Sequence, residues 1–131
     1  MWFAEARRDA FDPTDSVLAH GDPHAWNTLL DPKTDRYKFV DPDGLLIERA
    51  HDLSISMREW SAELLAGDPA ASGRKRCALL SRLTGVPQNA IWQWGFIERI
   101  VNGLRYIEVG PEETAVEFLA VVEAWAEAET V

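Results

Sequence analysis

The chain has 131 residues, of which 47% are hydrophobic, and its 22 acidic and 13 basic residues give a formal net charge of −9. These values are typical of one soluble domain, covering residues 1–131, and the acidic balance argues against nucleic acid or an anionic membrane surface as a partner. The single cysteine, Cys77, excludes an intramolecular disulfide and a multi-cysteine zinc site. No apolar run reaches ~18–20 residues and no secretory signal opens the chain, so we expect a cytoplasmic protein.

The first part of the chain predicts one short helix followed by strands and turns. Residues 2–10 are expected to be helical, and after a turn the apolar residues 16–19 are typical of a short strand. Two further strands are expected at residues 27–30 and 37–40. The six residues between them are rich in turn formers, which predicts a β-hairpin, and Asp-Pro-Asp-Gly at residues 41–44 then ends its second strand.

The rest of the chain predicts four helices. The first carries apolar residues at steps of three and four that share one face: Ala50, Leu53, Met57, Trp60 and Leu64. The second covers about residues 72–84 and ends at Gly85. The third begins at Pro87, and the last covers about residues 112–129 after a Gly-Pro break.

Apolar residues also mark the inward faces expected of the last two helices. In the third helix they are Ala90, Trp94, Ile97, Val101 and Leu104. In the last helix they are Ala115, Leu119, Val122 and Ala126. We expect the tryptophans of these helical faces, Trp60, Trp94 and Trp125, to lie in the core. The predicted fold class is therefore α+β and mainly α-helical, with a hairpin followed by four helices.

Three side chains around the predicted hairpin carry groups suited to phosphoryl transfer. Asn27 begins the first strand and Asp41 follows the second, so the hairpin brings an amide oxygen and a carboxylate together. A few oxygen ligands of this kind suit a Mg²⁺ ion that keeps waters and binds phosphate oxygens. Asp22, five residues before Asn27, could accept a proton from a hydroxyl. One base and two metal ligands are the groups that phosphoryl transfer needs.

Two short motifs contain these residues. His-Gly-Asp-Pro-His-Ala-Trp-Asn at residues 20–27 has the five-residue Asp-to-Asn spacing of the kinase motif His-Arg-Asp-x-x-x-x-Asn, and Val-Asp-Pro-Asp-Gly follows at residues 40–44. The sequence here resembles the catalytic loop and second motif of the aminoglycoside phosphotransferases, which share the protein-kinase-like fold. Residues 48–53 are similar to the family's segment ending in Asp-Leu. The similarity is closest to the streptomycin-type branch.

The resemblance implies a role for each of the central residues. Asp22 is expected to be the catalytic base, which orients and deprotonates the substrate hydroxyl. Asn27 and Asp41 are expected to hold Mg²⁺ on the phosphates of ATP. His20 is expected to be structural and to fix the backbone of the loop.

Three further residues have supporting or alternative roles by the same resemblance. His24 stands where protein kinases place a lysine near the transferring phosphate, so it either contacts phosphate or forms structural hydrogen bonds. Asp43 is a weaker candidate for binding metal or substrate. Asp52 is expected to brace the loop from the start of the following helix, where an acidic side chain also suits the helix dipole.

The resemblance also implies a nucleotide-clamping lobe. That β-rich lobe carries a glycine-rich loop and a strand lysine, whereas this chain has no Gly-x-Gly-x-x-Gly, and its lysines lie in or beside the hairpin or on a later helix. We therefore expect a C-terminal lobe that lacks its N-terminal partner and is weak or inactive alone. The acceptor implied is an aminoglycoside-like cation, which the acidic residues after Pro111 would attract.

A binding function is an alternative reading of the same residues. The chain could be a non-catalytic, dimerising remnant of a kinase-like protein, or a partner of the missing lobe. Either association would use exposed apolar surface, for which Trp2, Phe3 and Phe11 are candidates.

A metal-dependent phosphoesterase is a third reading, with Asp22, His24 and Asp41 as ligands. Di-metal hydrolases usually need several further His and Asp ligands. Beyond the catalytic-loop motif the only other histidine is His51, so this inventory is short.

Overall fold

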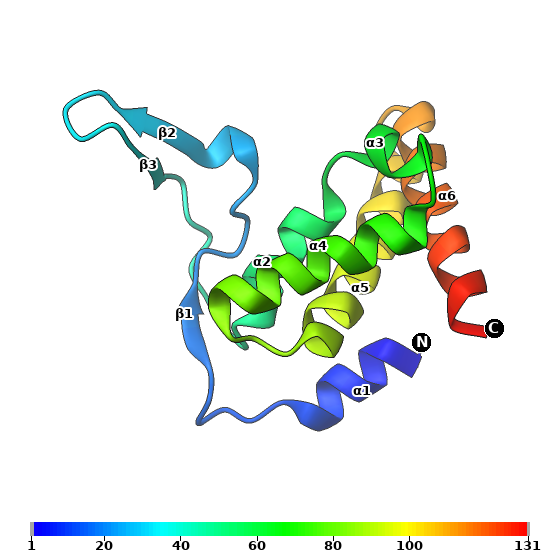
Figure 1. Ribbon diagram of the computed structural model, residues 1–131, viewed down its shortest axis with the longest axis horizontal. Helices are drawn as coiled ribbons and strands as arrows, with labels where there is room; N and C mark the ends of the chain where they lie inside the picture. Colours follow the sequence, from blue (N-terminus) through cyan, green and yellow to red (C-terminus); the bar gives the residue numbers. More distant parts are fainter. Residues whose placement is uncertain (1, 131) are drawn as a thin grey trace.

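The computed structural model describes residues 2–130, which form an α+β fold that is mainly α-helical. Met1 and Val131, the ends of the predicted domain, lie outside the described residues. In chain order the elements are α1 (Trp2–Ala10), β1 (Val17–Ala19), the 3-10 turn η1 (Ala25–Asn27), β2 (Thr28–Asp31), β3 (Arg36–Phe39), β4 (Leu45–Ile47), α2 (Ala50–Arg58), α3 (Ser61–Leu65), α4 (Pro69–Thr84), α5 (Gln88–Val109) and α6 (Glu112–Thr130). The β2–β3 hairpin projects away from the helices (Figure 1). Within residues 2–130, no helix combines the length and apolar character needed to cross a membrane.

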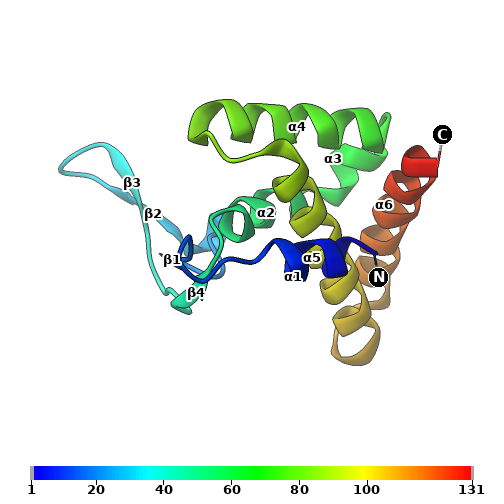
Figure 2. The same cartoon turned by 90° about the horizontal axis from the view of Figure 1, so that it is seen from below.

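The strands form two antiparallel pairs, β1 with β4 and β2 with β3. The predicted hairpin is confirmed, with Thr28 opposite Phe39, but both strands lie one residue nearer the turn than expected and leave only residues 32–35 as the loop. Strand β4 is absent from the sequence prediction. It forms because the chain reverses at Gly44, whose backbone is left-handed (φ 73°), and returns beside β1. Both pairs lie at the same end of the molecule (Figure 2).

The helix predicted over residues 50–64 is interrupted. α2 ends at Arg58, Trp60 has a left-handed backbone with φ of 58°, and α3 begins at Ser61. The chain after the hairpin therefore forms five helices within the described residues, where the sequence predicts four. Because the backbone turns at Trp60, its side chain is 49% exposed, and the prediction that it lies in the core is wrong.

A buried arginine on α5 stabilises this interruption. The guanidinium of Arg99 donates to the carbonyl oxygens of Met57 and Glu59 at 2.9 and 3.1 Å, and to Oγ of Ser61 at 3.0 Å. These bonds satisfy carbonyl groups that a continuing helix would use for its own ladder. The end of α2 is thereby attached to α5.

α5 buries the predicted face in its first half, where Ala90 is buried and Trp94 packs half-buried against the core, but not in its second half. Gly95, Arg99 and Gly103 follow one another at steps of four and are buried, and a Cβ on either glycine would come within 2.9 Å of a neighbouring side chain. The predicted inward residues Val101 and Leu104 are 55% and 53% exposed, so that prediction is wrong for the second half of the helix. In its second half the helix uses its small residues, rather than its apolar stripe, for close contact with its neighbours.

The core lies between α2, α3, α4, α5 and α6. Trp125 is fully buried, as predicted, and its ring lies 4.4 Å from that of Trp92. In α6 Val121 is also fully buried, whereas the predicted inward residue Ala126 is exposed. The predicted face is confirmed at Ala115, which is 1% exposed, and in the second half of α6 the buried face is rotated by about one residue from it.

α4 packs on α2 through sulfur atoms. Sγ of Cys77 lies 3.6 Å from Sδ of Met57, and both residues are buried. Burial raises the pKa of the Cys77 thiol to about 12. The helix ends at Gly85 with a left-handed backbone (φ 74°), as the sequence predicts.

We expect Gly95→Ala to lower the free energy of unfolding by about 1–3 kcal/mol, because overpacking a tight contact forces neighbouring elements apart. The new Cβ would lie 2.6 Å from Cβ of Met57, between α5 and α2. Gly67→Ala is the matched control, since nothing lies within 4 Å of a Cβ there. Urea unfolding followed by circular dichroism measures both variants, and a Gly95→Ala protein as stable as the wild type would contradict the close packing.

Candidate functional site

The carboxylate of Asp52 holds the backbone at the start of the loop at residues 20–27. Oδ2 of Asp52 accepts from the backbone N–H of His20 at 2.7 Å, and Oδ1 accepts from that of Gly21 at 2.9 Å. Asp52 reaches the loop because it lies in the first turn of α2, next to the end of β1. Gly21 has φ of +94°, and a Cβ there would lie 2.8 Å from Cβ of Asp43, so this position requires glycine. The brace expected of Asp52 is present as these two hydrogen bonds.

His20 connects the loop to the end of the hairpin. Its Nε2 lies 2.9 Å from the carbonyl oxygen of Val40, to which it donates, and its Nδ1 accepts from the backbone N–H of Asp22 at 3.3 Å. The ring also lies against Phe39, with centroids 5.4 Å apart. Both ring nitrogens and one face are used in structural contacts, so His20 positions its neighbours.

The carboxylate of Asp22 lies at the centre of the loop and is partly exposed. Its Oδ1 accepts from Nη2 of Arg58 at 2.7 Å, and its Oδ2 lies 3.3 Å from Nε2 of His24. Asn27 fixes the backbone of the same residue, because its Nδ2 donates to the carbonyl of Asp22 at 3.0 Å. The side chain of Asp22 is therefore oriented from two sides while part of it faces solvent.

The hairpin brings Asn27 and Asp41 together at its base. The backbone N–H of Val40, directly before Asp41, donates to the carbonyl of Asn27 at 2.9 Å. Since Nδ2 of Asn27 is already engaged, its Oδ1 remains available as an acceptor or ligand. Asp41 is exposed, and within residues 2–130 its carboxylate has no hydrogen-bonding or ion-pair partner. An amide oxygen and an unpaired carboxylate form a donor set that fits Mg²⁺.

Two further observations concern the acids of this turn. Asp41 has φ of 58°, a left-handed conformation that non-glycine residues adopt at a cost, and such conformations cluster at functional sites. The backbone N–H of Asp43 donates to the carbonyl of His20 at 2.8 Å, while its side chain is exposed. No group of three or more His, Cys, Asp and Glu side chains that could hold a metal occurs in the described part of the chain.

Arg58 is a central residue of the site that the sequence analysis did not identify. Its guanidinium contacts Asp22 at 2.7 Å, Glu59 at 3.3 Å and Glu98 at 3.4 Å. Burial lowers the pKa of Arg58, but its hydrogen bond with Asp22 and the charges of these carboxylates outweigh burial and raise the pKa. Nothing near the motif in sequence predicts this contact, because Arg58 comes from the far end of α2.

His51 extends the same charge network to the loop brace. Its Nε2 lies 3.6 Å from Glu98 and its Nδ1 lies 3.7 Å from Asp52. Burial lowers the pKa of His51, but contacts first with Glu98 and then with Asp52 outweigh burial and raise it. The buried histidine thus lies between the carboxylate that braces the loop and the carboxylate that holds Arg58.

A pocket of about 490 Å³ opens beside Asp22. The loop contributes Asp22 and His24, the end of α2 contributes Arg58, and the second half of α5 contributes a polar face that includes Arg105. From α6, the pocket wall contains Phe118, and the acidic residues of its first turn are not among the lining groups. A polar stripe on the third predicted helix is the sequence signal that could have indicated this wall.

Comparisons with models of protein families, with curated proteins and with solved structures found no match to this chain. The chemistry of the site therefore follows from its own groups. Asp22 offers a proton acceptor at the edge of a cavity large enough for a small molecule. Asn27 and Asp41 offer two oxygen ligands at the base of the same hairpin.

We expect Asp52→Ala to release the loop selectively. The substitution removes both acceptors of the His20 and Gly21 amides, and an unsatisfied buried donor costs about 1–3 kcal/mol. Hydrogen exchange followed by NMR should show faster exchange of these two amides. Asp68→Ala is the control, since it removes a cap hydrogen bond to Ala71 on α4 and should leave the loop amides protected. Unchanged exchange at His20 in the Asp52 variant would be inconsistent with the brace.

Proposed function

We propose that this chain provides the catalytic loop, metal ligands and acceptor pocket of an ATP-dependent small-molecule kinase, which transfers a phosphoryl group to a hydroxyl. The observation that carries the proposal is the arrangement of Asp22 at the edge of a pocket, with Asn27 and Asp41 joined beside it by the hairpin. The motif resemblance to the aminoglycoside phosphotransferases and to the C-terminal lobe of the protein-kinase-like fold supports the same proposal.

Asp22 acts in this proposal as the general base. The acceptor hydroxyl donates a hydrogen bond to the Asp22 carboxylate, which turns the oxygen toward the γ-phosphorus of ATP. As the new oxygen–phosphorus bond forms, the bond to the β-phosphate oxygen breaks, ADP leaves, and the hydroxyl proton passes to Asp22. Arg58 holds one carboxylate oxygen at 2.7 Å and thereby limits rotation of the base.

Asn27 and Asp41 are the residues that would hold Mg²⁺. A bound Mg²⁺ ion supplies positive charge to the phosphate oxygens of ATP. Asn27 also fixes the carbonyl of Asp22, so one side chain couples the position of the base to that of the metal ligands. His24 caps η1, because its Nδ1 accepts from the backbone N–H of Trp26 at 3.1 Å, and in this proposal its Nε2, which lies 3.3 Å from Asp22, would contact the transferring phosphate.

The nucleotide clamp belongs to an N-terminal lobe in this proposal, and exposed apolar residues support a docking surface for it. On the β1–β4 pair, Leu18 and Leu46 are 76% and 75% exposed, and they lie opposite each other. Among the candidates from the sequence, Trp2 and Phe11 are exposed, whereas Phe3 packs edge-on against a ring of α5. The same surface favours the alternative function, a non-catalytic module that associates with a partner or a second copy.

The first test of the function is Asp22→Asn in a protein that joins this chain to a nucleotide-clamping lobe. Loss of the base should lower kcat about 100-fold or more, with little change in nucleotide affinity. Asp35→Asn is the control for removal of an exposed acid of the hairpin, to which the proposal gives no role. Transfer of phosphate from ATP, measured by ADP release and by phosphorus NMR of the acceptor, gives the rate. Retention of the wild-type rate in the Asp22 variant would show that Asp22 is not the base.

The second test concerns the metal ligands and uses the chain alone. Mn²⁺ should broaden the amide NMR signals around Asn27 and Asp41, and Asp41→Asn should weaken this effect by removing the only charged ligand of the pair. Asp35→Asn is closely matched, because Asp35 lies in the loop of the same hairpin and also has a left-handed backbone (φ 52°), which asparagine tolerates. Equal Mn²⁺ affinity of the two variants would exclude Asp41 as a ligand.

A further inference from the structure

One face of α5 lines the pocket beside Asp22. Asn102, Arg105, Tyr106 and Val109 all contribute to the pocket wall, and their spacing of three and four residues places them in one row along the helix. Arg105 is exposed to the cavity in this row. The second half of α5 therefore forms a continuous polar and aromatic wall opposite the catalytic loop.

The charged side chains of this pocket differ in whether they have an oppositely charged partner. The two carboxylates of its wall, those of Asp22 and Glu59, both contact Arg58, at 2.7 and 3.3 Å. Arg105, in contrast, has no carboxylate within 4.0 Å among the residues that the structure describes. The acids of the wall are thus paired within the protein, where they share the guanidinium of Arg58 with Glu98, whereas Arg105 is a cation of the wall that has no carboxylate partner in the described part of the chain.

Aromatic groups form the apolar part of the same cavity. The rings of Tyr106 and Phe118 contact each other with centroids 5.5 Å apart, and both line the pocket. Trp26 at the rim is 87% exposed. A ligand in this pocket meets a carboxylate, a guanidinium and an aromatic surface. The carboxylate can accept a hydrogen bond from a hydroxyl, the guanidinium can bind an anion, and the rings can pack against an apolar skeleton.

We propose that the acceptor is a small hydroxylated carboxylic acid, whose carboxylate binds Arg105 while its hydroxyl points to Asp22. The guanidinium presents a planar pair of donors that matches the two oxygens of a carboxylate. The carbon skeleton of the acceptor packs on Tyr106 and Phe118. The term acceptor rests on the proposed kinase function. Binding of the acid itself does not, since it requires neither ATP nor metal.

This acceptor differs from the aminoglycoside-like cation implied by the motif resemblance. A polycation in the pocket would meet the unpaired Arg105, and its amines would compete with Arg58 for the carboxylates of Asp22 and Glu59. The charge of the ligand is therefore the property that separates the two proposals.

A series of three probes with one skeleton tests the charge. They are 4-(hydroxymethyl)benzoate, its neutral amide 4-(hydroxymethyl)benzamide, and the cation 4-(aminomethyl)benzyl alcohol. Each is titrated at low salt into the isotope-labelled chain, and amide NMR shifts report the affinity and the site. The acid should bind most tightly and shift signals around Arg105 and Phe118. Tighter binding of the cation, or of streptomycin, than of the acid would overturn the proposal.

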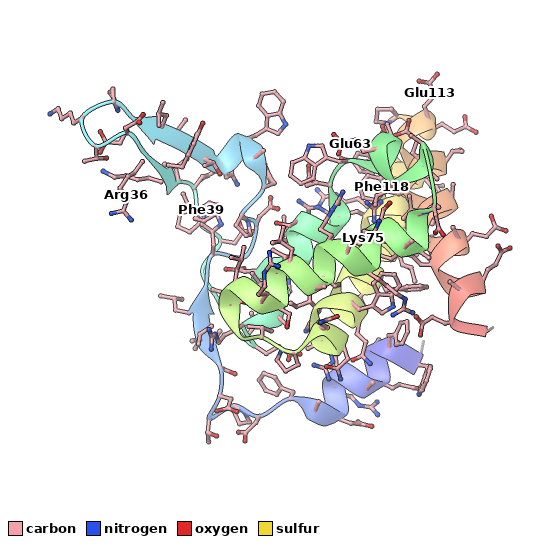
Figure 3. All side chains as sticks on the ribbon, viewed as in Figure 1. Arg36, Phe39, Glu63, Lys75, Glu113 and Phe118 are labelled. Atoms are coloured by element: carbon pink, nitrogen blue, oxygen red, sulfur yellow. The ribbon has the colours of Figure 1, made fainter. Side chains whose placement is uncertain are left out.

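Arginine variants identify the group that recognises the acid. Arg105→Gln should raise the Kd of the benzoate about three-fold or more, as expected for one exposed ion pair, and should leave the amide unaffected. Arg36→Gln is the matched control, because Arg36 is also exposed but lies on the hairpin, far across the molecule from Phe118 (Figure 3). Equal benzoate affinity in wild type and Arg105→Gln would refute the role of Arg105.

The outcomes also separate this proposal from the kinase function. Specific binding of the acid that depends on Arg105, without phosphate transfer in the joined protein, would remove the kinase function and keep the acid-binding site. Transfer of phosphate to a cationic acceptor, with no binding of the acid, would keep the kinase function and remove the acid-binding site. The comparison of the three probes in the wild-type chain decides the charge preference even if the Arg105 variant is less stable.

Discussion

The buried guanidinium of Arg99 fixes the geometry on which the candidate site depends. It lies among helices α2, α3, α5 and α6 with no exposed surface, against the ring of Trp125 at 5.2 Å, and it binds two backbone carbonyls and a hydroxyl. Burial lowers its pKa to about 9, so it is still charged at neutral pH, and its charge is balanced by carbonyl dipoles and ring faces. Arg99 holds the carbonyls of Met57 and Glu59, and it thereby fixes the position of the backbone of Arg58, which lies between them.

From this anchor a chain of polar contacts extends to the loop at residues 20–27. Arg58 joins Glu98 to Asp22, and His51 joins Glu98 to Asp52, whose carboxylate holds the first amides of the loop. The loop is therefore held at two points, its backbone at the start and its central carboxylate. Both points are attached to the same pair of helices, α2 and α5, so Asp22 and the pocket wall share one support.

Local chemistry explains what could be predicted from the sequence. The hairpin and the helix end at Gly85 were predictable because turn formers and a left-handed glycine act over a few residues. The break at Trp60 was not, because it depends on Arg99, which is distant in sequence. The buried face of α5 was missed for a related reason. Glycines interrupt an apolar stripe in the sequence, yet they allow the closest helix contacts in three dimensions.

In the candidate site too, residues that are close in sequence could be predicted, and residues brought together by helix packing could not. The motif spacing led to Asp22, Asn27 and Asp41, since these residues are close in sequence or are joined by one hairpin. Arg58 and Arg105 were not identified, because their proximity to the loop is created by the packing of α2 and α5. A short motif can therefore point to the chemistry of a site, whereas the charge that its ligand meets depends on the tertiary structure.

The sulfur contact between α4 and α2 gives the molecule an internal reporter. With a pKa raised to about 12 and no exposed surface of note, the thiol of Cys77 is protonated at neutral pH and shielded from reagents. It becomes reactive only when α4 separates from Met57. Because the sequence contains no other cysteine, the rate of alkylation of this chain measures the opening of its core at one defined helix interface.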